Sequence, residues 1–414
     1  MGKSMPGWRK VRFGEVVRQT KSKVDPETSG LERYVAGEHM DTDELRIRRW
    51  GEVGNGYLGP AFNVRFRPGQ VLYGSRRTYL RKIAVADFEG ICANTTFVLE
   101  SANPTVLLPE LLPFVMQTEA FHEHSKRESK GSVNPYVNFS DLAPYEFALP
   151  PMSVQERISR RLSSIEANRD EAKNLQSALS EALDALAQWY ATAGLRDVDA
   201  RGVVERKRLP HDWRLLSIRE ICTGGEAGLT LGPFGSDLKI DDYGHLKKGT
   251  PVLFVADVGR FDLRHQSQRF ISAAKHADLV SHEAIVGDVL VTEMGWPPGE
   301  ACVVPAGWPP SIIKADIIRA RVNPSKMAPA YLELVLNSHW GQQQIVRISP
   351  GTTRPRMTLR DFEQLLLAVP PLNEQQRAVQ QADNIRARKA DARRRLELLD
   401  ALKAAALATS TSES

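Results

Sequence analysis

The chain has 414 residues, of which 42% are hydrophobic and 25% are charged, values close to the average for globular proteins. These proportions exclude a disordered or fibrous protein, and the length predicts two or three domains. The 55 basic and 50 acidic residues give a net charge of +5, which permits a polyanionic partner without requiring one. Because we find no signal peptide and no apolar run long enough to cross a membrane, we expect a cytoplasmic protein.

Residues 1–152 predict a globular domain that mixes strands and helix. The segments QVLYGS, KIAVADF and CANTTFVLE are rich in β-branched and aromatic residues and lie between turn signals, as strands do. The later segment LLPELLPFVMQTEAFHEHSK is typical of helix.

A long helix is predicted over residues 153–194, since no Pro or Gly interrupts the chain between Pro151 and Gly194. Ser153 and Glu156 have the spacing of a capping box. Alternating steps of four and three residues give an apolar seam with two polar interruptions, which predicts a partner helix. The seam residues are Ile158, Leu162, Ile165, Arg169, Ala172, Gln176, Leu179, Leu183, Leu186 and Tyr190.

After a linker over residues 195–209, residues 210–371 repeat the first domain. The segment from Gly131 to Arg157 aligns without a gap with the segment from Gly351 to Arg377, and each aligned pair is 220 positions apart. Upstream matches at other offsets imply insertions, which loops in diverged duplicates tolerate. The sequence therefore predicts two copies of one unit, each a mixed α and β domain followed by a long helix.

The second long helix is predicted over residues 372–407, with Asn373 and Gln376 as its capping pair and a disordered tail over residues 408–414. One side carries the apolar residues Ala382, Ile385, Ala392, Leu396 and Leu399. We expect an α+β fold in which the two repeated domains are separated by an antiparallel coiled coil of the two helices.

The sequence carries no strong catalytic, metal or cofactor motif. Asn134-Pro135-Tyr136 comes near a methyltransferase motif but lacks its second proline, and a structural turn explains it better. Cys92, Cys222 and Cys302 form no CxxC pair, and HExxH spacing is absent. We therefore expect no catalytic residue, no metal and no bound cofactor, and an unrecognised enzyme is the least favoured alternative.

Several segments together resemble the specificity subunits of Type I restriction-modification systems. They are GQVL at Gly69, SRRTYLRK at Ser75, GPFGSDLK at Gly232 and the two Pro-Pro-x-x-x-Gln helix entries. The resemblance spans nearly the whole chain, and its layout is more specific than any single motif. It implies two target recognition domains, over residues 1–152 and 210–371, that each read half of a split double-stranded DNA site, with the helices fixing the spacer.

The resemblance also implies the partners. Two modification subunits would dock on the helices and methylate adenine with S-adenosylmethionine, and restriction subunits, which use ATP and Mg²⁺, would complete the nuclease. The chain itself would be a DNA-recognition subunit without catalysis. The segment GWPPGEACVVPAGWPP replaces the basic SRRTYLRK in the second domain, so we expect the two half-sites to differ.

The candidate DNA contacts lie in basic, aromatic or glycine-containing loops, which suit phosphate binding and base recognition. In the first domain they are Tyr73, Ser75, Arg76, Arg77, Tyr79, Arg81, Lys82, Lys130, Ser132 and Asn134. In the second they are Gly232, Phe234, Ser236, Lys239, Thr352, Thr353, Arg354 and Arg356. Two other functions stay open, a coiled-coil scaffold and a recognition subunit of another defence methyltransferase.

Overall fold

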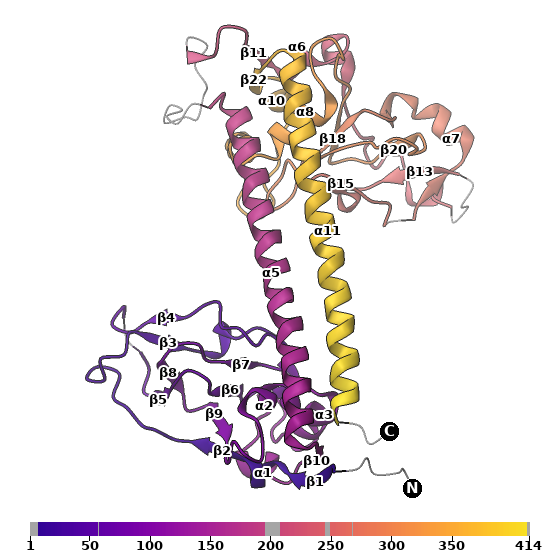
Figure 1. Ribbon diagram of the computed structural model, residues 1–414. Coiled ribbons are helices and arrows are strands. Elements are labelled where there is room, and N and C mark those ends of the chain that lie inside the picture. The colour runs from indigo at the N-terminus through magenta and orange to yellow at the C-terminus, as the bar shows by residue number, and fades with distance from the viewer. Residues whose placement is uncertain (1–6, 57, 195–207, 245–248, 267, 412–414) are drawn as a thin grey trace. The chain divides into compact units, whose positions relative to one another are not determined.

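The structure is a computed structural model that describes residues 7–56, 58–194, 208–244, 249–266 and 268–411. Two compact units divide the chain. Unit 1 consists of residues 1–174 and 393–414, and unit 2 of residues 175–392. Each unit thus holds one globular head and a part of both long helices (Figure 1). We call the globular parts head 1, residues 7–151, and head 2, residues 208–371.

Head 1 contains two four-stranded sheets and a short two-stranded one. In the first sheet the antiparallel order is β2 (Val17–Thr20), β9 (Thr96–Ser101), β6 (Val71–Gly74) and β7 (Ile83–Val85). In the second the order is β4 (Gly51–Glu52), β3 (Arg33–Val35), β8 (Gly90–Ala93) and β5 (Phe62–Phe66), with β3 and β8 parallel. The pair is β1 (Arg9–Arg12) with β10 (Glu146–Leu149).

Short helices cover the first sheet of head 1. They are α1 (Phe13–Val16), α2 (Leu112–Met116), α3 (Glu119–Arg127) and α4 (Phe139–Leu142). Thr118 begins α3 because its side chain accepts a hydrogen bond from the Phe121 amide. Phe121 and Leu99 are fully buried in one core that includes Leu162 from the first long helix.

Head 2 repeats this order. Its first sheet is β12 (Leu229–Leu231), β21 (Ile317–Ala320), β18 (Val289–Thr292) and β19 (Ala301–Val303). Its second is β16 (Phe270–Ile271), β13 (Thr250–Leu253), β20 (Ser311–Ile313) and β17 (Glu283–Ala284). Two further pairs are β11 (Arg214–Ser217) with β22 (Leu366–Val369) and β14 (Val258–Gly259) with β15 (Asp262–Leu263). The helices are α6 (Ile218–Ile221), α7 (Ala273–Asp278), α8 (Pro329–Leu336), α9 (His339–Arg347) and α10 (Leu359–Glu363).

The strand registers confirm the predicted duplication. Val71 of β6 pairs with Leu99, and Val289 of β18, which is 218 positions later, pairs with Ala320 in the same antiparallel arrangement. In both heads a parallel strand pair, β3 with β8 and β13 with β20, sits in the second sheet. The two heads are therefore the same fold, as the alignment around the Pro-Pro segments predicts.

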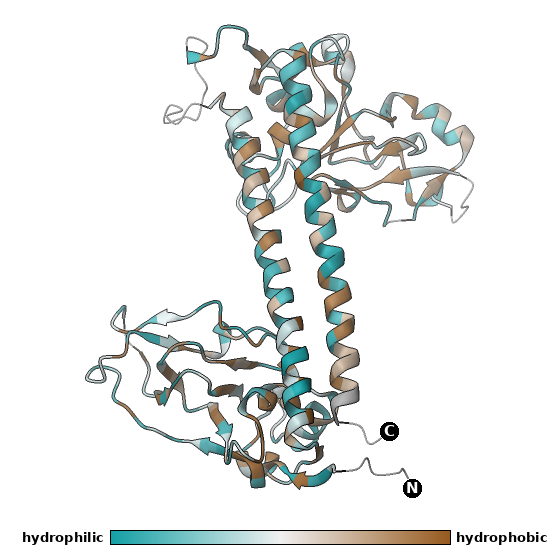
Figure 2. Ribbon diagram, in the orientation of Figure 1, coloured by the Kyte–Doolittle hydropathy of each residue, from teal (hydrophilic) through white to brown (hydrophobic). Residues whose placement is uncertain are grey.

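The long helices are α5 (Met152–Ala191) and α11 (Leu372–Thr411), each of 40 residues and thus about 60 Å long. Every residue of the predicted α5 seam is buried or half-buried. In unit 1 the helices run antiparallel, since Arg169 contacts Asp400 while Glu166, one turn earlier, contacts Lys403. Figure 2 shows apolar and polar residues alternating along both helices, as this one-sided packing requires.

Both helices differ from the prediction at their ends. Ser153 and Asn373 lie inside the first turn rather than capping it, because the carbonyl of the second proline of each pair already accepts the first helical bonds. Ala193 and Gly194 adopt positive φ, so α5 ends at Ala191 rather than at residue 194. The tail predicted from residue 408 is helical to Thr411, since Ala406 packs in the unit 1 core and no Gly or Pro follows. Residues 195–207 of the predicted linker and residues 412–414 lie outside the described residues.

Candidate DNA interface

Two loops of head 1 meet at one surface, which we call loop pair 1: residues 75–82 after β6 and residues 128–138 after α3. Arg76 and Lys130 each bridge to Tyr136. The Arg77 amide donates to the Pro135 carbonyl at 2.6 Å, and its guanidinium donates to Oδ1 of Asn134 at 2.8 and 3.0 Å. The structure thus brings together two segments that are far apart in the sequence.

Most predicted DNA contacts on loop pair 1 are accessible. Arg76, Arg77, Ser132 and Asn134 are exposed, and the Tyr79 ring is 50% exposed. Lys130 is also exposed, but its ammonium lies 2.7 Å from Asp141. That hydrogen bond lowers the pKa of Asp141 and raises the pKa of Lys130.

Tyr73 and Ser75 are not on the surface, which corrects their predicted role. Tyr73 is 3% exposed, because alternate side chains of β6 point into the core, and burial raises its pKa to about 12. Its hydroxyl bonds Ser125 at 2.5 Å. Ser75 is 5% exposed, and its hydroxyl donates to the Thr95 carbonyl at 2.7 Å. Both side chains hold the loop rather than face a ligand.

Arg81 and Lys82 are also engaged within the protein, contrary to the prediction. The Arg81 guanidinium bonds Asp43 at 2.9 Å, Glu119 at 2.6 Å and the Gln117 carbonyl at 3.1 Å. Its hydrogen bond lowers the pKa of Glu119. Lys82 donates to the Gly37 carbonyl. These two cations therefore fix the end of the loop, and phosphate contacts by Arg76 and Arg77 stay a prediction.

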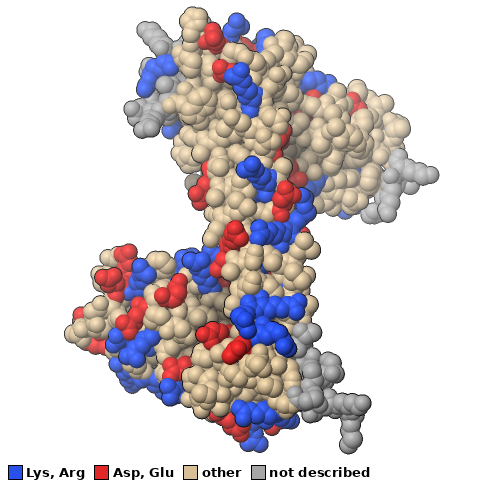
Figure 3. All heavy atoms as spheres, in the orientation of Figure 1, with Lys and Arg blue, Asp and Glu red and all other residues tan. Residues whose placement is uncertain are grey.

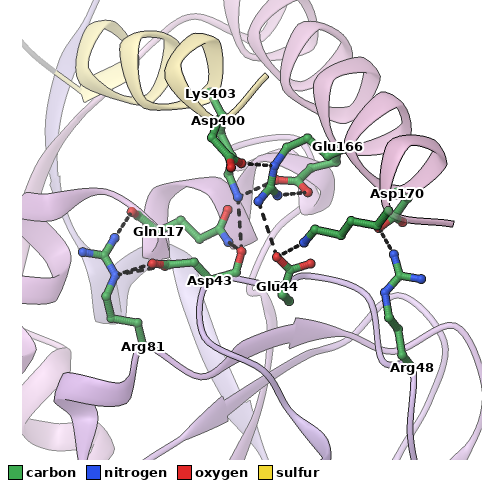
Figure 4. A network of polar contacts seen from close by, with 11 residues as sticks. Asp43, Glu44, Arg48, Arg81, Gln117, Glu166, Asp170, Asp400 and Lys403 are labelled. Atoms are coloured by element: carbon green, nitrogen blue, oxygen red, sulfur yellow. Dashed lines mark hydrogen bonds and ion pairs between the residues drawn. The ribbon is translucent and has the colours of Figure 1, made fainter. Parts of the chain in front are cut away.

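Figure 4 shows that the contacts of Arg81 continue into a network that reaches both long helices. The Asp43 carbonyl accepts from Lys403 of α11 at 3.4 Å, and Lys403 pairs with Glu166 of α5. Arg169, 7% exposed at its side chain, lies 2.6 Å from Asp400 and 2.8 Å from Glu166. Burial lowers the pKa of Lys403. The network positions loop pair 1 relative to the helix segments of unit 1.

Head 2 has an equivalent surface, loop pair 2, formed by residues 293–300 after β18 and residues 349–357 after α9. The Met357 amide donates to the Glu293 carbonyl at 3.1 Å, which matches the 3.0 Å bond from Val137 to Ser75 in head 1. Trp296, 78% exposed, lies in this loop. Its segment, GWPPGEACVVPAGWPP, differs from the basic segment of head 1, but Trp296 itself was not among the predicted contacts. The offset of 218 places Trp296 beside the position of Tyr79, and that signal could have found it.

The predicted contacts of loop pair 2 differ in whether their side chains already have partners within the protein. Thr352, Thr353 and Arg354 are exposed, and Arg354 has no ion-pair partner among the described residues. Arg356 instead forms an ion pair with Asp316 and lies 3.8 Å from Glu293. Burial raises the pKa of Glu293. Loop pair 2 therefore offers fewer unpaired cations than loop pair 1.

Gly232, the first residue of the glycine segment of head 2, does not have the predicted role of a phosphate contact. Gly232 is buried, and a Cβ there would lie 2.1 Å from the Lys314 carbonyl oxygen. The glycine thus permits close contact between two segments of the protein. Phe234, Ser236 and Lys239 are exposed, so their DNA contacts stay a prediction.

Comparison with known proteins identifies a family model over part of the chain. Residues 7–180 match the family model described as the Type I restriction modification DNA specificity domain. Over 105 residues the chain is 30% identical to the Type I restriction enzyme EcoDI specificity subunit of Escherichia coli. This segment is 25% of the present chain, and it spans only 23% of that relative.

Solved structures from Type I restriction-modification systems share the fold over nearly the whole chain. One, described as the structural basis of complex assembly and conformational transition of the type I R-M system, is 23% identical, with a TM-score of 0.56. The match covers 99% of this chain and 98% of that one. The Type-I restriction-modification system S subunit from M. genitalium is 13% identical, with a TM-score of 0.59 and coverage of 98% and 96%.

The remaining reactive groups are buried. Cys92, Cys222 and Cys302 lie in the cores, and burial raises the pKa of the Cys92 and Cys222 thiols to about 12. Among the described residues no group of three or more His, Cys, Asp or Glu could hold a metal ion.

No helix in the described ranges is long and apolar enough to cross a membrane. Figure 3 shows basic and acidic side chains intermixed on the face it displays.

Proposed function

We propose that this chain is the DNA-recognition subunit of a Type I restriction-modification complex and that it binds a two-part DNA sequence. Head 1 reads one half of the target and head 2 reads the other. The observation that carries the proposal is the presence of loop pairs 1 and 2 at equivalent places on two copies of one fold, in a chain whose residues 7–180 match the specificity-domain family model.

The side chains on the loop pairs support different half-sites. Loop pair 1 presents Arg76 and Arg77, which suit phosphates and the major-groove edge of guanine. Loop pair 2 presents Trp296 and Arg354 on the same backbone scaffold. Equal scaffolds with unequal side chains favour two recognition surfaces of different specificity.

The partners and cofactors belong to the same proposal. Two modification subunits would dock on the long helices and methylate adenine with S-adenosylmethionine, and restriction subunits would use ATP and Mg²⁺. The chain itself would contribute recognition and no catalysis, in the cytoplasm. Helices α5 and α11 are unbroken over 40 residues, which supports a role in setting the spacer between the half-sites.

Mapping methylated adenines in the genome of a strain with and without this chain tests the proposal. We expect a methylated motif of two short sequences separated by a fixed spacer, and we expect it to disappear on deletion. Restoring the chain with Arg76, Arg77 and Arg354 changed to Ala should not restore methylation, whereas Arg9→Ala, an exposed arginine of β1, should. Methylation that is independent of the chain would refute the proposal, and full restoration by the triple variant would favour a scaffold.

A further inference from the structure

A polar groove lies in head 1 beside loop pair 1, and no predicted contact residue lines it. Its volume is about 530 Å³. The polar residues that line it include Lys21, Lys23, Asn63, Asn94, Thr96 and Asn138. Residues of β2, β9, β5 and α4 line the groove, and one of them, Phe97, also belongs to the core.

Three side chains of this groove have no hydrogen-bond or ion-pair partner among the described residues. Lys21 and Lys23 are exposed, and within the described residues neither forms an ion pair. Asn94 is exposed, and its side-chain amide makes no hydrogen bond to any described residue. Asn63, by contrast, donates to the Pro60 carbonyl at 3.1 Å. Two free cations and one free amide thus line the same groove.

The groove adjoins loop pair 1, because Asn138, the last residue of that loop pair, lines it. The Thr95 carbonyl, next to Asn94, accepts from both the amide and the hydroxyl of Ser75, at 3.0 and 2.7 Å. Ser75 is followed by the exposed Arg76, and its carbonyl accepts from Val137 at 3.0 Å. Asn94 and Arg76 are therefore each next in sequence to one member of the hydrogen-bonded pair Thr95 and Ser75.

Head 2 lacks these three side chains at the equivalent positions. The Glu293 amide donates to the Asp316 carbonyl at 2.7 Å, just as the Ser75 amide donates to Thr95, so Ala315 is the counterpart of Asn94. Thr20 pairs with Val98, and Thr230 pairs with Arg319 in the same register.

Counting on from these threonines, Leu231 and Pro233 stand where head 1 has Lys21 and Lys23. The buried Gly232 packs against the backbone of Lys314 and Ala315 there. Lys21, Lys23 and Asn94 thus occur in only one of two heads that share a fold. Residues that select a DNA sequence are expected to differ in this way, whereas residues that maintain the fold are not.

We propose that this groove is a base-reading surface of head 1, in which Asn94 recognises an adenine while Lys21 and Lys23 bind the flanking phosphates. A free amide offers the donor and acceptor that pair bidentately with N6 and N7 of adenine in the major groove. Lysines bind phosphates as point charges without sequence preference. This inference rests on the proposed function and names a part of the half-site that head 1 reads.

The test of Asn94 is the methylated motif of cells that carry Asn94→Ala. We expect one A·T position of one half-site to relax, with discrimination there falling by about 5- to 100-fold, while the other half-site is unchanged. Asn94→Asp, which keeps the size but replaces the amide donor with a negative charge, should abolish methylation of the original motif. Asn55→Ala, an exposed asparagine of the same head whose amide donates to Glu52, is the matched control.

The test of the lysines is a salt titration of DNA binding by the purified full chain. Changing Lys21 and Lys23 to Ala should weaken binding to every sequence and reduce the slope of log affinity against log salt by about 2. Lys10→Ala, an exposed lysine of β1 paired with Glu146, should leave the slope unchanged. An unchanged motif with Asn94→Ala and Asn94→Asp, or equal slopes for the groove and Lys10 variants, would overturn the inference. Failure of the proposed function would appear separately, as the absence of a two-part motif in the unaltered strain.

Discussion

Gln155 and Gln375 make the same three hydrogen bonds in the two heads. Oε1 of Gln155 accepts from the Leu108 amide at 2.8 Å, and its Nε2 donates to the Val106 and Pro150 carbonyls, both at 2.9 Å. Gln375 has the same contacts with Ala328, Lys326 and Pro370, at 2.8, 2.9 and 2.9 Å. Both side chains are at most 1% exposed. Each glutamine therefore fastens the entry of a long helix to the loop before the head's α2 or α8 helix.

Replacing Gln155 by Ala should destabilise unit 1 by about 2–4 kcal/mol, because three hydrogen bonds are removed and buried backbone groups are left without partners. Native-state hydrogen exchange measures this locally. The Leu108 amide should exchange much faster in Gln155→Ala, whereas the Ala328 amide should be unaffected, and Gln375→Ala should show the reverse. Equal protection of Leu108 in both variants would show that the glutamine is dispensable.

Arg76 and Arg77 should contribute to the electrostatic part of DNA binding by head 1. With both changed to Ala, we expect the affinity to fall for all sequences and the salt slope to drop by about 1 for each phosphate that is no longer bound. Fluorescence anisotropy of a labelled duplex across a salt series measures this. The exposed Arg9→Ala serves as the control, and a slope no lower than that of Arg9→Ala would exclude these arginines.

Arg81 should behave in the opposite way, because its guanidinium already bonds Asp43, Glu119 and the Gln117 carbonyl. Arg81→Ala is expected to lower the free energy of unfolding by about 1–2 kcal/mol, while the exposed Arg76→Ala stays within about 0.5 kcal/mol. Urea unfolding followed by circular dichroism compares the two. Equal stability of both variants would contradict the structural role of Arg81.

Trp296 should contribute to binding of the half-site read by head 2. Its side chain is 78% exposed, and large aromatic residues dominate many interfaces. We expect Trp296→Ala to weaken binding to a duplex with both half-sites by about 10-fold, which corresponds to about 1.4 kcal/mol. A duplex in which the second half-site is scrambled should bind both proteins equally. The same 10-fold loss on that duplex would show that Trp296 does not act by recognising the second half-site.

Glu333 should make the stability of unit 2 depend on pH. Glu333 is 5% exposed, and its carboxylate accepts from the Val303 amide at 2.9 Å and lies 3.1 Å from Arg386. Burial raises its pKa. A raised pKa means that the folded state holds the proton more tightly than the unfolded state. This contribution to stability is therefore full below the ordinary pKa near 4.5 and is lost as the pH rises through the raised value.

Glu333→Gln removes that dependence while keeping an acceptor for Val303. We expect its free energy of unfolding, relative to the unaltered chain, to increase as the pH rises from about 4.5, by about 1.4 kcal/mol for each unit of the original shift. Urea titrations at several pH values measure the difference. Two curves that run parallel over this range would contradict the prediction.

The sequence was sufficient for the architecture because the features that define it are local and repeated. Helix length follows from the absence of Gly and Pro, the α5 seam follows from its spacing, and the duplication follows from aligned segments. The helix ends were harder. Ser153 and Asn373 match a capping pattern, yet the carbonyl of the preceding proline accepts the first helical bonds. Helix α5 therefore begins at Met152, one residue before its predicted start, whereas α11 begins at Leu372 as predicted.

The candidate site was only partly predictable, since the direction of a side chain depends on strand register and on distant partners. Tyr73 and Arg76 are three positions apart, but the first lies on the core side of β6 and the second lies beyond its end. Arg81 looks like any surface cation until Asp43 and Glu119 are placed beside it. Asn94 carries no signal in the sequence, because only the fold brings it beside Lys21 and Lys23.

Unit 1 is assembled from segments that the ribosome makes at very different times. Arg169 and Asp400 are 231 residues apart, so at about 5–20 residues per second the second follows the first by roughly 10 to 50 s. During that interval the nascent unit 1 lacks Asp400 and Lys403, and Arg169 has only Glu44 and Glu166 as ion-pair partners. Unit 2, whose residues 175–392 are contiguous, can close its core earlier. Unit 1 is thus the last to be completed, and premature termination before residue 400 should damage the half of the protein that was synthesised first.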